Sequence, residues 1–281
     1  WCYQSQYSCD DTCRDPNHWA AQFPSCGGLR QSPINIVTSK VHINSALPPF
    51  TFIGHTDVVN VTVENKGHSA HFILPQSVQL TGGALPGQYR AAQFHFHWGG
   101  NGRPGSEHTI DGERFPMELH IVHIKEPYGS LAEAEHDMAG IALLAFLFEV
   151  IHEDVILVIA ALGRVQINGM NSVTLMCETN IIPSAKELHG YYRYVGSMTT
   201  PGCEQAVAWT LMFQFCPSPL QLDAIVKQCK FWTGQPMTDI FRPTQPLDGR
   251  VVYRSKASSC NSTDTLNRPM IYVEKLLCVC V

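Results

Sequence analysis

The chain consists mainly of short stretches that are either apolar throughout or alternate apolar with polar residues, and many of their side chains are β-branched or aromatic. Such stretches are typical of β-strands buried on one or both faces. Glycine pairs separate them, as at Gly82-Gly83 and Gly99-Gly100. We therefore predict strands over residues 58–63, 88–98, 117–125, 141–150 and 206–213.

Helical periodicity is rare in this chain. Residues 219–231 have apolar side chains at the spacing of a helix face, namely Leu222, Ile225, Val226 and Cys229. No internal repeat or break in composition divides the chain. We expect a mostly β (α+β) domain over residues 1–256 with a few peripheral helices, an irregular N-terminal cap over 1–30 and a tail over 257–281.

Composition narrows the class of protein. The 281 residues are 44% hydrophobic and carry a net charge of −5, which suits a soluble globular protein. The lack of a basic block argues against nucleic-acid binding. No run of about eighteen apolar residues is present, so we expect no transmembrane span.

The cysteines indicate an oxidising compartment. The chain has 11 of them, and Cys2, Cys9 and Cys13 crowd a polar N-terminal stretch that is typical of disulfide-stapled segments. Cys2 is expected to pair with Cys9 or with Cys13. The odd total leaves at least one thiol free or bonded to another chain.

Two further features favour secretion. The chain begins with Trp1 and Cys2 rather than with Met, as expected of a mature form whose signal peptide has been removed. N-glycosylation sequons begin at Asn60 and Asn261. We expect a protein that is secreted or held at the extracellular face of the plasma membrane.

Histidines alternate with aromatic residues in Gln93-Phe94-His95-Phe96-His97-Trp98. In a strand, residues two apart share a face, so His95 and His97 lie together while the aromatic rings face the core. Two imidazoles at this spacing can both reach one metal ion. The alternative is an ordinary strand without a metal, which the 13 histidines of the chain would also allow.

The segment Met117 to His123 alternates in the same way, with Glu118, His120 and Val122 on one face. One histidine from this strand would complete three nitrogen ligands. Three protein ligands with an open position are characteristic of catalytic rather than structural zinc. Gln93 and Glu118 each precede a candidate ligand by two residues and could accept the spare N–H of its ring.

Longer motifs make the sequence similar to the alpha carbonic anhydrases, most of all to their extracellular, often lipid-anchored members. The resemblance runs from residue 1 to about 255. It rests on Trp1-Cys2-Tyr3, Gln31-Ser32-Pro33-Ile34-Asn35-Ile36, Asn65-Lys66-Gly67-His68, Gln93 to Trp98, Gly105-Ser106-Glu107-His108, Met117 to His123, Tyr194 to Pro201 and Arg242-Pro243-Thr244-Gln245-Pro246. It implies one large, mainly antiparallel twisted sheet with zinc at the base of a conical cleft.

The resemblance also implies an activity, which is the zinc-dependent, reversible hydration of carbon dioxide to bicarbonate by attack of zinc-bound hydroxide. The implied Zn²⁺ ligands are His95, His97 and His120. Thr199 is the implied acceptor of the hydroxide's proton in a hydrogen bond, and it donates its own O–H to Glu107. This chain of bonds would aim the nucleophile at carbon dioxide.

Substrate and proton sites follow from the same resemblance. His68 matches the proton shuttle, with Lys66 and His71 as unusual neighbours, and Tyr3 resembles a tyrosine of the solvent network. A cation beside His68 would lower its pKa, and His71 could be a second relay or only a polar residue of the cleft. The implied apolar pocket comprises Val122, Leu143, Met198, Thr200, Val207 and Trp209, with Leu143 larger than the usual valine.

The resemblance implies a Cys26–Cys203 disulfide that braces the Thr199 loop, and Cys216 with Cys229 is a weaker suggestion. Sulfonamide-type inhibitors are expected partners of the site. Small residues near Ser258 and a short apolar end permit either a lipid anchor or a disulfide-linked secreted form. The alternative to an active enzyme is a carbonic-anhydrase-like binding or matrix protein of low activity.

Overall fold

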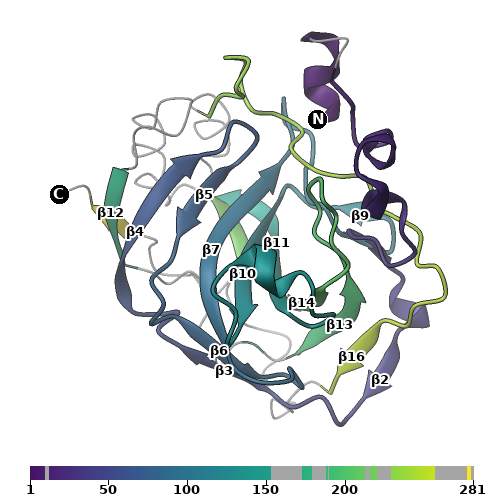
Figure 1. The fold of residues 1–281 in the computed structure, drawn as a ribbon, viewed down its shortest axis with the longest axis vertical. Helices are drawn as coiled ribbons and strands as arrows, with labels where there is room; N and C mark the ends of the chain where they lie inside the picture. The colour runs from purple at the N-terminus through teal and green to yellow at the C-terminus, as the bar shows by residue number, and fades with distance from the viewer. Residues whose placement is uncertain are drawn as a thin grey trace.

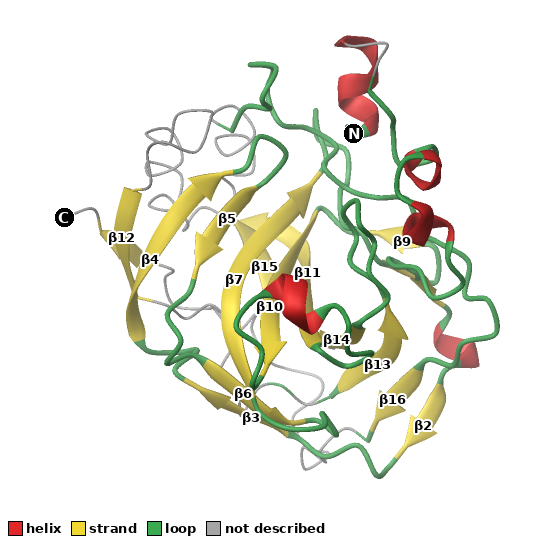
Figure 2. Ribbon diagram, viewed as in Figure 1, coloured by secondary structure: helices red, strands yellow, loops and turns green. Residues whose placement is uncertain are grey.

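The computed structural model describes residues 1–9, 13–152, 173–178, 188, 190–212, 216–219, 229–256 and 277–279. Within these ranges strands dominate and helices are short and peripheral (Figure 1, Figure 2). The predicted mostly β class is confirmed. Most of the predicted 219–231 helix, residues 220–228, lies outside the described residues. No helix of the described ranges is long and apolar enough to cross a membrane.

The described strands are β1 (Asn35–Ile36), β2 (His42–Asn44), β3 (Phe50–Ile53), β4 (Val58–Asn65), β5 (Ala70–Ile73), β6 (Gln79–Gly82), β7 (Tyr89–Trp98), β8 (Thr109–Ile110), β9 (Glu113–Arg114), β10 (Met117–Lys125), β11 (Ile141–His152), β12 (Val173–Glu178), β13 (Tyr191–Gly196), β14 (Val207–Met212), β15 (Cys216–Pro219), β16 (Tyr253–Ser255) and β17 (Leu277–Val279). The one α-helix among them is α1 (Leu131–Ala134), and η4 (Thr38–Lys40) is a 3-10 turn. All five predicted strands are present, as β4, β7, β10, β11 and β14.

One large twisted sheet organises the described residues, in the order β17-β12-β4-β5-β7-β10-β11-β14-β13-β16-β2. Neighbours are mainly antiparallel, as predicted, and the parallel pairs are β11 with β14, β11 with β15 and β16 with β2. Strands β7, β10 and β11 lie at its centre (Figure 1). A separate small sheet has the order β1-β8-β9.

The central strands are buried on both faces, which explains why residues 141–148 are apolar without a break. One face carries the first core, in which the rings of Phe72 and Phe94 stack with centroids 4.5 Å apart. The other face carries the second core, which includes Val122, Leu143 and Trp209. Side-chain alternation therefore assigns each central residue to one of two packed faces.

The N-terminal cap is more regular than the sequence predicted. It contains three 3-10 helices, η1 (Gln4–Cys9), η2 (Trp19–Ala21) and η3 (Pro24–Gly27). The expectation of an irregular segment was wrong because a buried aromatic anchors these turns: Trp19 is fully buried and donates its indole N–H to the carbonyl of Arg14, 3.1 Å away.

Two disulfides are present among the described residues. Cys2 pairs with Cys13, which decides between its two predicted partners, and Cys26 pairs with Cys203 as predicted. Cys229 is free and buried, so the suggested bond to Cys216 was wrong. The disulfides agree with the predicted secreted or extracellular location, because such bonds persist in oxidising compartments.

Candidate metal centre and active site

Three histidines meet where β7 and β10 run antiparallel. The register places His120 opposite His95 and Glu118 opposite His97. All three imidazoles are at least 94% buried, with exposures of 6% for His95 and 1% for His97 and His120. Their ring centroids lie 4.5 to 5.2 Å apart. The strand-face argument from the sequence therefore selected histidines that the structure brings into one cluster.

The nitrogens of these rings could hold one metal ion. One ligand atom from each of His95, His97 and His120 lies within 4.8 Å of the others. Burial lowers the pKa of His95 well below its ordinary value and also lowers that of His97. Neutral imidazole is the form that binds a metal, so burial prepares both rings for coordination.

Each ring is oriented by an acceptor on its other nitrogen. Gln93 Oε1 lies 2.9 Å from His95 Nδ1, and Glu118 Oε1 lies 2.7 Å from His120 Nε2. The carbonyl oxygen of Ile240 lies 2.7 Å from His97 Nδ1. Since these oxygens accept, each contacting nitrogen carries the proton and the opposite nitrogen presents a lone pair.

His97 gives an independent test of whether a metal fits. Its Nε2 is buried and has no hydrogen-bond partner among the described residues. A buried nitrogen lone pair without a partner is costly. A cation bound by the three rings would satisfy it, and three neutral imidazoles are a donor set that zinc accepts.

Glu118 is the hub behind the metal-binding group. Its Oε2 accepts the backbone N–H groups of Glu107 and His108, both at 2.8 Å, and its Oε1 lies 2.6 Å from His108 Nδ1. Burial opposes ionisation of Glu118, but His108 and His120 outweigh it and hold its pKa well below the ordinary value. His108, Glu118 and His120 are also close enough to hold an ion. The ligand atoms of these three residues already make hydrogen bonds. We therefore assign His108 and Glu118 the role of orienting the metal-binding histidines rather than that of binding a second ion.

Glu107, one residue of the predicted orienting pair, lies beside the metal-binding histidines, with its Oε1 3.5 Å from His97 Nδ1. Glu107 is fully buried and its Oε1 accepts the backbone N–H of Arg242 at 2.8 Å. Its Oε2 is buried without a hydrogen-bond partner among the described residues, and Thr199 is 4% exposed. The expected bond from Thr199 to Glu107 is therefore not formed here, although an acceptor for it is free.

Most of the predicted pocket residues form one apolar surface next to the histidines. Val122 lies opposite Leu143 and Leu143 lies opposite Trp209 across β10, β11 and β14. The Trp209 and His120 rings are 4.9 Å apart. Val207 and Met198 belong to the same second core, and Thr200 is half-buried at the start of a turn.

The predicted proton-transfer residues form a line of rings leading to the metal-binding group. His71 stacks on His95 with centroids 5.1 Å apart, and His68 contacts His71 at 6.4 Å. Trp1 packs 4.6 Å from His68. Burial, followed by the charge of Lys66, lowers the pKa of His68 to about 4.

Tyr3 lies in the aromatic cluster of the N-terminal cap. It is fully buried, 5.5 Å from Trp1 and 6.0 Å from Trp19 between ring centroids. Its hydroxyl has no hydrogen-bond partner among the described residues. Burial, and then the charge of Glu107, raises its pKa well above the ordinary value, so Tyr3 stays a neutral hydroxyl.

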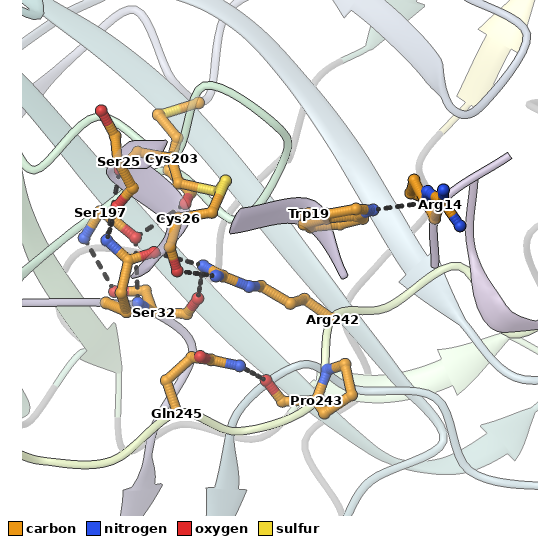
Figure 3. The surroundings of a disulfide bond; sticks show 12 residues. Arg14, Trp19, Ser25, Cys26, Ser32, Ser197, Cys203, Arg242, Pro243 and Gln245 are labelled. Carbon is orange, nitrogen blue, oxygen red and sulfur yellow. Dashed lines mark hydrogen bonds between the residues drawn. A yellow bond between two sulfur atoms is a disulfide. The ribbon is translucent and has the colours of Figure 1, made fainter. Parts of the chain in front are cut away.

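The Cys26–Cys203 disulfide is joined to the site by a buried arginine (Figure 3). Arg242 Nη2 donates to the carbonyl of Cys26 at 3.0 Å, and Nη1 donates to Gln31 Oε1 at 2.8 Å. The backbone N–H of the same arginine holds Glu107. Sequence reasoning placed Arg242 in a motif but gave it no role, because the partners of its guanidinium group are more than two hundred residues away.

The segment that carries Thr199 is fixed by a second set of contacts. Ser32 and Ser197 exchange hydrogen bonds, each backbone N–H donating to the other's hydroxyl at 3.0 Å. The backbone N–H of Cys203 donates to the carbonyl of Thr200 at 2.9 Å. Residues 197–203 are therefore held from both ends.

Comparison with known proteins agrees with this geometry. The family described as eukaryotic-type carbonic anhydrase matches residues 14–256. Carbonic anhydrase 4 of Rattus norvegicus is 38% identical over 99% of this chain and 91% of its own length.

Two further relatives have similar coverage. Carbonic anhydrase 15 of Mus musculus is 36% identical over 94% of this chain and 85% of its own length. Carbonic anhydrase 6 of Bos taurus is 34% identical over 94% of this chain and 84% of its own length. The chain therefore belongs to the eukaryotic-type carbonic anhydrases and is an enzyme of that family.

Proposed function

We propose that this carbonic anhydrase interconverts carbon dioxide and bicarbonate at a zinc ion held by His95, His97 and His120. The observation that carries the proposal is the buried Nε2 of His97, which has no hydrogen-bond partner in the described part of the chain and lies beside two other oriented imidazoles. When bound, zinc would supply the Lewis acidity that makes water a nucleophile near neutral pH, for which carbonic anhydrase is itself the standard example.

The residues around the three histidines would fix their geometry. Gln93, Glu118 and the carbonyl of Ile240 hold the rings in one tautomer each. Supporting acceptors of this kind raise metal affinity and keep the rings from rotating. The ligand geometry is thus set before any metal arrives.

Thr199 and Glu107 would orient the nucleophile. The backbone of Arg242 occupies one oxygen of Glu107, which leaves Oε2 to accept the hydroxyl proton of Thr199. A threonine that donates to Glu107 can only accept from a further partner. It would therefore hold the attacking oxygen with one lone pair directed at carbon dioxide.

Carbon dioxide would bind against the apolar surface formed by Val122, Leu143 and Trp209, with Val207, Met198 and Thr200 around it. The substrate has no net charge or dipole, so an apolar wall costs it no lost hydrogen bonds. Leu143 is 1% exposed. Its extra methylene relative to valine would reduce the space for carbon dioxide and so affect the turnover rate.

His68 would carry the proton to solvent, with His71 between it and the metal-binding group and Tyr3 in the solvent network. His68→Ala should lower kcat and leave kcat/KM for carbon dioxide unchanged, and added imidazole should restore kcat. If His71→Ala shows an equal loss of kcat that added imidazole also restores, His71 is a second relay. If kcat of His68→Ala equals that of the parent protein in weak buffer, the shuttle is elsewhere.

The main test is stopped-flow hydration of carbon dioxide on protein with its zinc content measured. Hydration should rise with zinc occupancy and fall by several orders of magnitude in His95→Ala. The exposed His136 provides a matched control, and His136→Ala should retain the parent rate. No hydration above the buffer rate at full zinc occupancy would refute the proposal and favour a low-activity binding or matrix protein.

Several expectations from the sequence stay as proposals. We place the domain over residues 1–256 and the tail over 257–281, and we expect sulfonamide-type inhibitors to bind the metal. Asn60 lies in β4 and Asn261 lies outside the described residues, and both remain predicted glycosylation sites. Mass spectrometry before and after glycosidase treatment would test them.

A further inference from the structure

Two cysteines without a described disulfide lie opposite each other in the strand register at the edge of the large sheet. Strand β17, near the C-terminus, pairs antiparallel with β12, and the register places Cys278 directly opposite Cys177. The two residues are 101 positions apart in sequence, so only the strand pairing brings them together.

This backbone placement suits a disulfide. Residues directly opposite in an antiparallel pair have Cα atoms about 4.5–5.5 Å apart. Disulfides span Cα separations of about 4.4–6.8 Å. The Cα separations in Cys2–Cys13 and Cys26–Cys203 are 5.7 Å and 4.9 Å. The backbone separation of a directly opposite pair therefore falls within the range that a disulfide spans.

The register also distinguishes Cys278 from its neighbour Cys280. Met176 lies opposite Val279 and Glu178 lies opposite Leu277, so Cys278 is the residue that the register places opposite Cys177. On the other side of β12, Cys177 lies opposite Val59 of β4, which packs against the first core. Cys278, Cys177 and Val59 therefore occupy one row of the strand register.

We propose that Cys177 and Cys278 form a disulfide in the secreted protein, which fastens the C-terminal strand to the outer edge of β12. The two thiols lose two protons and two electrons through a mixed disulfide with a dithiol-disulfide oxidoreductase, whose own disulfide becomes a dithiol. The S–S bond then holds β17 over backbone groups of β12 that could otherwise pair with another chain.

The proposal has a consequence for the form of the protein. Residues 277–279 must be present in the mature chain for the bond to exist. A lipid anchor added near Ser258 would remove them. The disulfide and the anchor are therefore mutually exclusive in one molecule.

The test is a disulfide map of the full chain secreted from eukaryotic cells. Free thiols are alkylated first, and the protein is then digested with trypsin without reduction. Cleavage after Arg164, Lys186 and Lys275 gives one peptide with Cys177 and a C-terminal peptide, residues 276–281, with both Cys278 and Cys280. We expect these peptides to be linked, with alkylation of Cys177 nearly absent.

Variants assign the partner. The link should persist in Cys280→Ala and disappear in Cys278→Ala, where Cys177 becomes alkylated while Cys26–Cys203 remains intact. Electron-transfer fragmentation of the parent linked peptide gives the same assignment if a variant is not secreted. Alkylated Cys177 in the parent protein, a different partner for it, or a chain ending before residue 277 would overturn the proposal.

Discussion

Removal of the Cys26–Cys203 disulfide should destabilise the protein more than removal of Cys2–Cys13. The two bonds close loops of very different length, with sequence separations of 177 and 11. In the chain-entropy description, the longer loop contributes about 5 kcal/mol and the shorter about 3 kcal/mol at 25 °C. The double variants Cys26→Ala/Cys203→Ala and Cys2→Ala/Cys13→Ala therefore form a matched pair.

The measurement is equilibrium unfolding in urea, with carbon dioxide hydration measured on the same samples. We expect the long-loop variant to lose about 2 kcal/mol more unfolding free energy than the short-loop variant. It should also lose activity, because the S–S bond fixes the two segments whose backbone groups contact Thr200 and Arg242. Equal losses of stability, or a larger loss in the short-loop variant, would refute the loop-closure reasoning.

Two further predictions concern buried ionisable groups. Glu118→Gln should weaken zinc binding about 10- to 100-fold, measured by competition with a chelator. Glu113 is exposed, and the control variant Glu113→Gln should keep the parent affinity. Equal zinc affinities of the two variants would contradict the role of the Glu118 carboxylate. His55 and His123 face each other with their Nε2 atoms 3.0 Å apart, and burial lowers their pKa values from 6.5 to about 4 and about 3. Below pH 6.5 the unfolded chain binds protons at both rings and the folded protein does not. The free energy of unfolding is therefore highest above pH 6.5 and falls as the pH drops toward about 4. The measurement is urea unfolding at several pH values within this window. His55→Gln should reduce the slope of unfolding free energy against pH by about 1.4 kcal/mol per pH unit. An unchanged slope would contradict the assignment of this pH dependence to His55.

The central strands could be predicted because their pattern is local. Alternation in 93–98 and 117–123 places three histidines on one face, and the antiparallel register of β7 and β10 then brings them together. The last two strands at one end of the large sheet, β16 and β2, are three residues long. They are too short to show the alternation of apolar and polar residues that identifies a strand, and they form by pairing with distant parts of the chain.

The cap was harder to predict because its regularity comes from tertiary contacts. The turns of η2 and η3 are too short for helical periodicity to be detected. They are fixed by the burial of Trp19 and by the bond between Cys26 and Cys203. The choice between Cys9 and Cys13 as the partner of Cys2 likewise depended on how these turns fold.

The three ring acceptors mark the limit of strand-based reasoning at the site. Residues two apart share a face, so Gln93 supports His95 and Glu118 supports His120 from the same strand. The corresponding position for His97 is His95, which is itself a proposed ligand and has no oxygen to offer. The third acceptor therefore has to come from another part of the chain, and it is the carbonyl of Ile240. Two adjacent ligands on one strand thus require a long-range contact, which ties the segment before Arg242 to the site.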